Sequence, residues 1–471
     1  MSADQFTPDS GVASISPVNG WAGEFRAQFA LGWPLIVAQL TQISLLTTDV
    51  VMLGWLGPKY LAAAALANAF FIALQLLGLG ITEAVAPLVA QALGAGELRS
   101  VRRIFQQGIW LALLTALLLF PIIWNIAPVY AALGQDRELT AMAEVFVHYA
   151  IWLTIPNLLI SVLRSFLSAH GVTRVILWIM VAGFGVNAVA DYALIFGNWG
   201  FPRLELAGAG IATTTTSTAM LVLFAAYMLT HRRFRRYHVL HRLVEFDWPR
   251  FRDLLRVGLP IGLMRFAEVL LFTSASLFQG WIGQDAVAAH AIALQLASIT
   301  FMVPLGISQA ATVRVGLAFG ERDRDGVRRA GWTAQIVTIA FMSCAALCFL
   351  VAPGLFVGLF LDPSRPGDAH AFQLATAYLV VAGLFQLFDG TQVTMGAALR
   401  GLSDTRVPLY IALFGYWLIG MPVAYVFAFP LGMQGVGIWW GLAAGLAAVA
   451  IILTIRFAMR DRLGLTSPQP A

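Results

Sequence analysis

Charged residues and cysteines are both scarce in this sequence. Only 11% of its 471 residues are Asp, Glu, Lys or Arg, 59% are apolar, and the mean hydropathy is +0.79. A water-soluble chain of this length would need a more polar surface, so a soluble multidomain protein is excluded. The two cysteines, Cys344 and Cys348, lie one helical turn apart in an apolar stretch. They could share a metal, but their apolar surroundings favour a role in packing.

Long apolar runs recur along the whole chain. Each is about 20 residues or more, the length that crosses a bilayer as a helix. Backbone groups in lipid must be satisfied internally, so these Gly- and Ala-rich runs are predicted to be helices. No HExxH, CxxC or Gly-x-Ser-x-Gly signature lies in them, so a membrane enzyme is not expected. We predict an all-α membrane protein with twelve spans, at 29–55, 61–92, 104–130, 141–168, 174–197, 208–230, 254–281, 286–318, 331–360, 372–401, 406–430 and 435–458.

The stretch from residue 32 to residue 94 has a second, similar copy later in the sequence. Pro34 recurs 226 residues later as Pro260, and the same register holds without a gap as far as Gly94, which matches Gly320. Later parts of the two copies match at offsets of 232 and 227, which indicates small insertions or deletions in loops. The chain is therefore two copies of one six-helix unit, an arrangement typical of transporters.

Positive charges fall mainly on one side of the predicted helices. With the N-terminus inside, the loops of that side and the two termini hold 22 of the 29 Lys and Arg, and the opposite loops hold four. This asymmetry predicts that both termini are cytoplasmic. Each copy then starts on the same side and spans six times, so the copies are parallel repeats about an axis along the membrane normal.

The pattern divides the chain into five parts. We expect a disordered cytoplasmic tail at 1–25, an N-lobe at 26–230, a basic cytoplasmic linker at 231–253, a C-lobe at 254–460 and a second cytoplasmic tail at 461–471. Nucleic acid is not an expected partner of a basic loop in a protein of this kind. The linker arginines are expected to set the topology and to meet anionic lipid headgroups.

Ionisable residues inside the predicted spans need a partner, water or a function, because each costs at least ~2.5 kcal/mol at mid-bilayer. In the N-lobe, Asp49 lies seven residues after Gln42 on one helical face, and Asn187 and Asp191 are one turn apart. With Thr213 they form a set of oxygen donors. Such a set suits a small hard cation, and two close carboxylates also suit a proton. A polar network that only fixes helix packing is the alternative.

The second copy provides an internal control for this set. The counterparts of Asp49, Asn187, Asp191 and Thr213 are Ala275, Ile419, Val423 and Trp440. The polar residues are therefore not needed to build the fold, and this favours a functional role.

The C-lobe carries a different pair of acids. Glu268 lies three residues after Arg265, which it could simply neutralise, whereas Asp389 has no basic neighbour within one turn. Both acids need a partner, water or a function, and a functional role is favoured most for Asp389. Glu83 has Gln309 as its counterpart, so this position is polar in both copies. The polar residues expected to line a substrate cavity are Gln42, Glu83, Gln279, Gln386 and Gln392.

Four stretches together resemble the multidrug and toxic compound extrusion (MATE) transporters, and within them the NorM-like branch. The resemblance covers about residues 26–460. It is carried by residues 42–54 with their Thr48-Asp49-Val50-Val51-Met52 core, by Ala288-Ala289-His290-Ala291-Ile292, by Pro304-Leu305-Gly306-Ile307-Ser308-Gln309-Ala310 and by Leu399-Arg400-Gly401-Leu402-Ser403-Asp404-Thr405-Arg406.

The resemblance implies two six-helix lobes around a V-shaped cavity that alternates between the faces of the membrane. It implies export of organic, often cationic and amphipathic compounds from the cell inner membrane, in exchange for Na⁺ or H⁺ and without a cofactor. Asp49, Asn187, Asp191 and Thr213 resemble the family's N-lobe site, and Glu268 and Asp389 resemble the C-lobe site of NorM-like members. Which lobe couples, and to which ion, stays open.

Two further expectations complete this interpretation. We expect a monomer. The alternative function is that of a flippase for a lipid-linked saccharide precursor, from the same wider superfamily, for which a strongly cationic central cavity would be expected.

Overall fold

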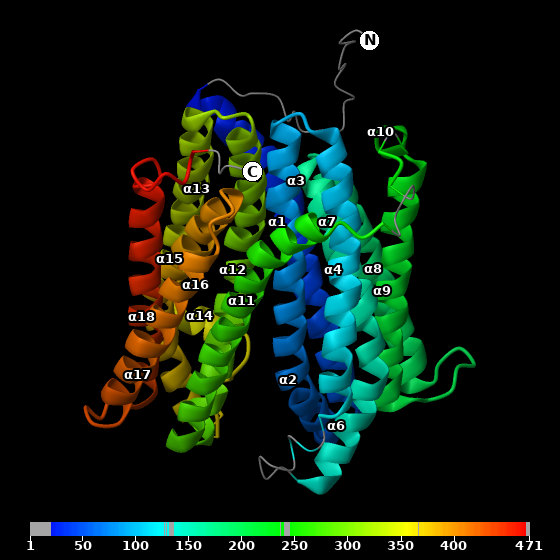
Figure 1. Cartoon of the computed structure of the whole chain (residues 1–471). Coiled ribbons are helices and arrows are strands. Elements are labelled where there is room, and N and C mark those ends of the chain that lie inside the picture. The colour runs from blue at the N-terminus through cyan, green and yellow to red at the C-terminus, as the bar shows by residue number, and fades with distance from the viewer. Residues whose placement is uncertain are drawn as a thin grey trace. The chain divides into compact units, whose positions relative to one another are not determined.

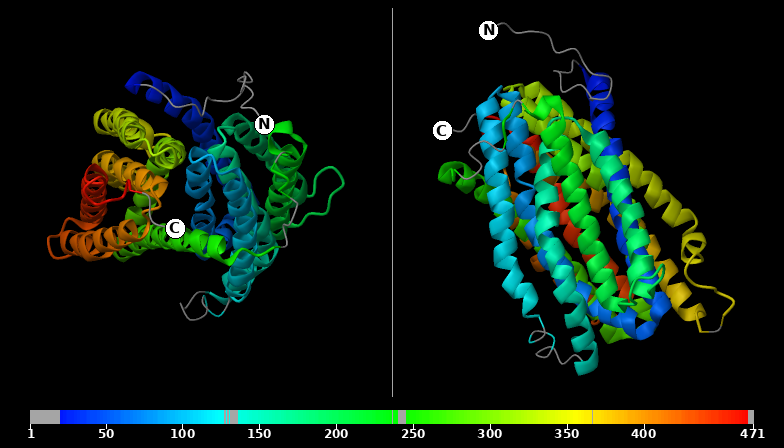
Figure 2. Two further views of the ribbon diagram at one scale, coloured as in Figure 1. Left: turned by 45° about the horizontal axis from the view of Figure 1, so that its top comes forward. Right: turned by 90° about the vertical axis from the view of Figure 1, so that its right-hand side faces the viewer.

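The computed structural model describes residues 20–126, 128, 130, 136–235, 237–239, 245–365 and 367–467. Within these ranges the regular secondary structure is helical and contains no strand (Figure 1). The chain divides into two compact units, Met1–Leu259 and Pro260–Ala471. The long helices of each unit run side by side (Figures 1 and 2). The all-α membrane architecture predicted from the sequence is confirmed.

The first unit contains six membrane-length spans. They are α1 (Trp21–Leu56), α2 with α3 (Pro58–Thr82 and Val85–Gly94), α4 (Leu98–Trp124), α6 with α7 (Arg137–Ala150 and Thr154–Ala169), α8 (Thr173–Phe196) and α9 (Glu205–Thr230); a short α10 (Arg232–Arg235) follows. Of the two predicted tails, residues 1–19 and 468–471 lie outside the described residues. The helix in the predicted span 104–130 ends earlier, at Trp124, because Asn125 leaves the helical conformation. The side-chain amide of Asn125 donates to the carbonyl of Pro121 at 2.9 Å.

The second unit contains five further spans. They are α12 (Gln284–Gly320), α13 (Arg324–Val351) followed by a short α14 (Pro353–Val357), α15 (Ala369–Gly401), α16 (Arg406–Leu413) continuing through a π-helical segment (Phe414–Gly420) into α17 (Met421–Ala428), and α18 (Gln434–Ala458). In the described part of the chain, eleven helices are thus long and apolar enough to cross a membrane. The predicted span 254–281 is also helical, as α11 (Trp248–Ile282), but it is not one of these eleven.

The backbone repeats as the sequence does. Gly57 (φ 136°) separates α1 from α2, and Gly283 (φ 152°), 226 residues later, separates α11 from α12. Glycine adopts this conformation far more readily than other residues, so the same turn is built into each copy. Gly96 (φ 73°) and Arg322 (φ 62°), also 226 residues apart, are both left-handed just after the ends of α3 and α12. The duplication therefore extends from residue identity to local geometry.

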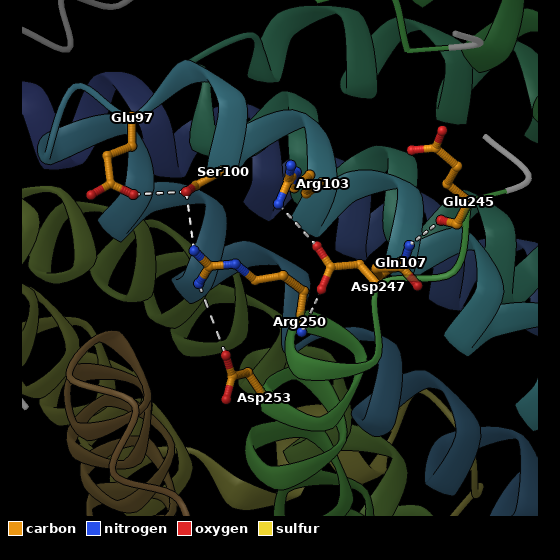
Figure 3. A network of polar contacts seen from close by, with 8 residues as sticks. All are labelled: Glu97, Ser100, Arg103, Gln107, Glu245, Asp247, Arg250 and Asp253. Atoms are coloured by element: carbon orange, nitrogen blue, oxygen red, sulfur yellow. Dashed lines mark hydrogen bonds and ion pairs between the residues drawn. The ribbon is translucent and has the colours of Figure 1, made fainter. Parts of the chain in front are cut away.

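Part of the predicted linker packs against α4 (Figure 3). Gln107 Nε2 donates to the carbonyl of Glu245 at 3.0 Å, and Arg103 forms an ion pair with Asp247 at 3.4 Å. These contacts hold the chain to the first unit just before α11 begins. Residues 236 and 240–244 of the linker lie outside the described residues.

The two cysteines are exposed on α13, so the expectation that they serve in packing is wrong. The buried face of this helix is formed by Met342, Ala346 and Phe349. One-turn spacing places both cysteines together on another face of the helix. Apolar surroundings in the sequence could not distinguish the face that meets lipid from the face that meets protein.

Candidate functional site

Asp49, Asn187, Asp191 and Thr213 lie together in the first unit. Asp49 is on α1, Asn187 and Asp191 are on α8, and Thr213 is on α9. Asn187 Nδ2 donates to Asp49 Oδ1 at 2.8 Å and also donates to Asp191 Oδ2. Thr213 Oγ1 lies 3.3 Å from Asp49 Oδ2 and 2.9 Å from the carbonyl of Ala209 on its own helix. The structure thus brings all four predicted residues into one cluster.

Two side-chain oxygens of this cluster have no hydrogen-bond partner among the described residues. Asn187 and Asp191 are fully buried, and the Oδ1 atom of each has no hydrogen-bond partner among the described residues. A buried oxygen without a partner is costly, so such atoms are normally satisfied by a proton, a water or an ion. Asp49 is only partly buried, so the cluster borders on accessible space.

The cluster can hold a small cation or a proton. Carboxylate, amide and hydroxyl oxygens are hard donors that suit hard cations. Two carboxylates that interact this closely also titrate as a pair and can share a proton. Across the ranges that the structure describes, no group of three or more His, Cys, Asp or Glu side chains is placed to hold a metal ion.

The second unit joins its two acids through one glutamine. Gln392 Nε2 donates to Glu268 Oε1 at 2.9 Å and to Asp389 Oδ1 at 3.2 Å. Tyr416 donates in turn to Gln392 Oε1 at 2.7 Å. Tyr416 lies in the π-helical segment Phe414–Gly420, and π-helical segments are frequent at functional sites. Each unit thus contains two carboxylates that a side-chain amide connects.

A small pocket opens beside Glu268. Its polar wall is Arg265, Glu268, Gln392, Arg400 and Tyr416, and its apolar wall is Met264, Val393, Gly396, Val449 and Leu453. Sequence reasoning missed Arg400 and Tyr416 as members of this site. Arg400 lies at the end of the predicted span 372–401, where an arginine is also compatible with a loop, and Tyr416 stands in an apolar run without any polar neighbour to mark it.

Gln42 and Glu83 lie near an arginine that the sequence did not single out. Arg164 of α7 donates to Gln39 Oε1 at 2.9 Å and to Gln42 Oε1 at 3.4 Å. It also interacts electrostatically with Glu83. An arginine inside the predicted span 141–168 was the available signal, because such residues are rare in membranes and are usually paired.

The other predicted cavity residues are deeply buried in the second unit. Gln279 is fully buried, and it bonds the carbonyl of Gly435 and the hydroxyl of Tyr378, each at 3.2 Å. Gln386 is also fully buried and accepts a hydrogen bond from Thr300 at 2.6 Å. Both side chains therefore contribute to contacts between helices within this unit.

The chain matches known proteins along nearly its whole length. The MatE family model matches residues 34–193 and again residues 260–426, and the two matches start at the 226-residue offset of the repeat. The chain is 44% identical over 455 residues to a "Probable multidrug resistance protein NorM" of Mesorhizobium japonicum, which covers 95% of this chain and 96% of that protein. It is 43% identical over 446 residues to the protein of that name from Brucella suis, covering 94% and 95%.

Solved structures show the same fold. A MATE protein in complex with MaL6 matches with a TM-score of 0.87 at 19% identity, covering 98% of this chain and 100% of that one. The eukaryotic MATE transporter AtDTX14 matches with a TM-score of 0.85 at 20% identity, covering 95% and 100%. At these identities the solved structures show only that the fold is shared. The assignment of the chain to a family rests on the family model and on the relatives of 43–44% identity. The chain therefore belongs to the MatE family of membrane transport proteins.

Proposed function

We propose that this protein is a secondary active antiporter that exports organic, often cationic and amphipathic drugs in exchange for Na⁺ or H⁺. The name multidrug resistance protein, carried by relatives that match nearly the whole chain, supports drug export. Ion coupling rests on one observation, the pair of the partly buried Asp49 and the fully buried Asp191, beside which two buried oxygens have no hydrogen-bond partner among the described residues. Among the described residues, no basic side chain neutralises this pair. Buried charges without a partner are costly, so the pair requires a cation or a proton.

The coupling follows from competition for negative charge. A cation or proton bound at Asp49 and Asp191 removes the attraction of these carboxylates for a cationic drug, so the drug leaves. Release of the ion on the other side of the membrane restores the charge, and drug binds again. Ion and drug therefore weaken each other's binding, and alternating access turns this antagonism into export.

The positions of the side chains support the residue roles that we propose. Asp49, Asn187, Asp191 and Thr213 are proposed to bind the cation, and Glu268 with Asp389 is the second candidate site. For contact with substrate, the partly buried Gln42 and Glu83 are favoured over Gln279, Gln386 and Gln392, which are buried and already bonded within the second unit.

The proposed setting is the cell inner membrane. A monomer with both termini cytoplasmic would contain an N-lobe at 26–230 and a C-lobe at 254–460, joined by the basic linker 231–253. The distribution of arginine between predicted loops supports this topology. The double match of the family model supports the two-lobe division.

Transport by the purified protein in liposomes tests both the class and the ion. Liposomes receive ethidium as a fluorescent organic cation, and a Na⁺ gradient and a pH gradient are imposed separately. We expect one of the gradients to drive ethidium movement, and we expect D49N to lose this driven movement although it inserts and purifies normally. Full ion-driven transport by D49N would refute the proposed site. Movement of a lipid-linked saccharide without either gradient would indicate the flippase instead.

A further inference from the structure

The connection between the two copies begins with a basic segment that contains no acid. Residues 231–239 include four arginines and neither Asp nor Glu, so their formal charge is +4 with the histidines neutral. Residues 245–256, which lead into α11 and form its start, include three arginines and three acids, so their formal charge is zero. The two basic parts of this connection therefore differ strongly in net charge.

The basic segment is held on the first unit by its aromatic and apolar residues. Phe234 and Tyr237 are buried. The ring of Phe234 lies 5.3 Å from that of His170, which follows α7, and the Tyr237 hydroxyl lies 2.9 Å from His170 Nε2. The carbonyl of Val239 accepts a hydrogen bond from Gln106 of α4 at 2.8 Å. These contacts fix the backbone on both sides of α10, so its arginines have a defined position.

Two of these arginines lie at the surface without a counter-charge. Arg232 and Arg235 are exposed and three residues apart in α10, so they are neighbours on one helical turn. In the described part of the chain, no acidic side chain forms an ion pair with either of them. At the start of α11 the arginines are interspersed with acids, and Arg250 lies 3.9 Å from Asp253 (Figure 3).

The second copy has an acid within the corresponding segment. At the offset of 227, the counterparts of Arg233 and Phe234 are Arg460 and Asp461. Arg460 is buried and lies 3.5 Å from Asp461. In the first copy the position of this acid is taken by the aromatic residue that anchors α10. The positive charge of the segment is therefore not reduced there.

The helix before α10 presents an apolar face. α9 ends at Thr230 and is long and apolar enough to span a membrane. Val222 and Leu229 are seven residues apart, which places them on one face of α9, and they are 60% and 40% exposed. In a bilayer this face meets acyl chains. Because α10 begins only two residues after α9 ends, its arginines lie at the level of the headgroups.

We propose that Arg232 and Arg235 bind the phosphate of an anionic phospholipid whose acyl chains lie along the exposed face of α9. Basic side chains next to a membrane helix attract anionic headgroups, and guanidinium groups donate to phosphate oxygens in a fixed geometry. A soluble phosphate could use the arginines but not the apolar face, so the surface favours a lipid. Of the linker arginines expected to meet lipid, those of α10 form the site. It is separate from both carboxylate clusters and does not depend on ion coupling.

The test measures the melting temperature of the purified full-length protein in detergent. The protein is titrated with phosphatidylglycerol, with phosphatidylcholine or with inorganic phosphate, since a ligand that binds only the folded state raises its stability. R232Q/R235Q removes the proposed contacts. R252Q/R256Q is the matched control, because it removes the same charge from two exposed arginines of α11.

Phosphatidylglycerol is expected to raise the melting temperatures of the wild type and of R252Q/R256Q at similar concentrations. Each arginine near an anionic lipid surface strengthens binding roughly fivefold. R232Q/R235Q should therefore need about 25-fold more phosphatidylglycerol for the same rise. Phosphatidylcholine and inorganic phosphate should give much smaller rises in all three proteins. If the double variant fails to fold, R235Q alone decides, with an expected change of about fivefold.

Three results would overturn the inference. An equal loss of response in R232Q/R235Q and R252Q/R256Q would mean that overall charge attracts the lipid, without a site at α10. An unchanged response in R232Q/R235Q would place the lipid elsewhere. A rise with inorganic phosphate as large as that with phosphatidylglycerol would identify a soluble anion as the ligand.

Discussion

Asn187 Nδ2 lies 2.8 Å from Asp49 Oδ1, and this contact joins α8 to α1 within the cluster of Asp49, Asn187, Asp191 and Thr213. Because the same nitrogen also donates to Asp191, a single amide fixes two carboxylates. In the second unit, Gln392 does the same for Glu268 and Asp389. Both units therefore contain two carboxylates joined by one side-chain amide, but the residues that form this arrangement occupy different positions of the repeat.

Replacing Asn187 should weaken ion binding without preventing folding. Asn187→Ala removes the donor that both carboxylates share, and a hydrogen bond to a charged group contributes about 1.5–3 kcal/mol. We expect the half-saturating ion concentration for ethidium transport to rise about tenfold or more, since 1.4 kcal/mol corresponds to a factor of ten. Asn198→Ala is the matched control, because Asn198 is partly buried and its side-chain amide donates to the carbonyl of Tyr192, away from both carboxylates. An unchanged ion titration in the Asn187 variant would count against the cluster.

Ion and drug should antagonise each other in the absence of a membrane. In detergent, the affinity of the wild type for ethidium is expected to fall as the coupling ion is added, and linkage requires the reverse effect to be equally large. In D191N one carboxylate is gone, so this dependence should be largely lost. Fluorescence polarisation of ethidium, titrated with Na⁺ and separately with acid, measures both. A wild-type affinity that is insensitive to both ions would contradict competitive coupling.

The Tyr416 hydroxyl should stabilise the second unit. Tyr416 is almost fully buried and donates to Gln392 Oε1 at 2.7 Å, so Tyr416→Phe leaves a buried acceptor without its donor. A loss of about 1–3 kcal/mol is expected for this change, visible as a lower melting temperature in detergent. Tyr410→Phe serves as the control, because Tyr410 is 67% exposed. Equal melting temperatures for the two variants would show that the hydrogen bond adds nothing.

Gly441 of α18 should not tolerate a larger side chain. A Cβ at this position would meet the backbone of Ala424 on α17, so the two helices would have to separate. Gly441→Ala is expected to destabilise the protein by about 1–3 kcal/mol, the usual cost of overpacking. At Gly54 of α1 nothing lies within 4 Å of an added Cβ. Gly54→Ala should therefore leave the melting temperature in detergent unchanged or slightly raised, and a similar loss in both variants would contradict the packing argument.

Two glutamines of α4 should protect the linker from proteolysis. Gln106 and Gln107 donate to the carbonyls of Val239 and Glu245 at 2.8 and 3.0 Å. Gln106→Ala with Gln107→Ala frees both carbonyls, so trypsin is expected to cut the linker at its arginines several times faster. Arg103→Ala is the control. It removes only a partly exposed ion pair, and pairs of this kind contribute about 0–1 kcal/mol.

The helices and the duplication could be predicted from the sequence because both depend on local properties. Apolar runs of sufficient length must be helical in lipid, and Pro34 and Pro260 mark the register of the repeat. Predictions that depended on which helix face meets which neighbour were less successful. The expectation that Cys344 and Cys348 serve in packing was wrong. Arg164 was overlooked, although it contacts Gln39 and Gln42.

The sequence by itself determined how many acids the spans contain and how unevenly the two copies share them. Only the tertiary structure decided which acids meet and which lie beside a guanidinium, because Asp49 and Asn187 are 138 positions apart and Glu268 and Gln392 are 124 apart. Electrostatic interaction depends on distance and on burial, and both are set by how helices pack. In both units a side-chain amide joins two carboxylates, but only Glu268 shares a pocket with two arginines, Arg265 and Arg400. Composition alone does not reveal this difference.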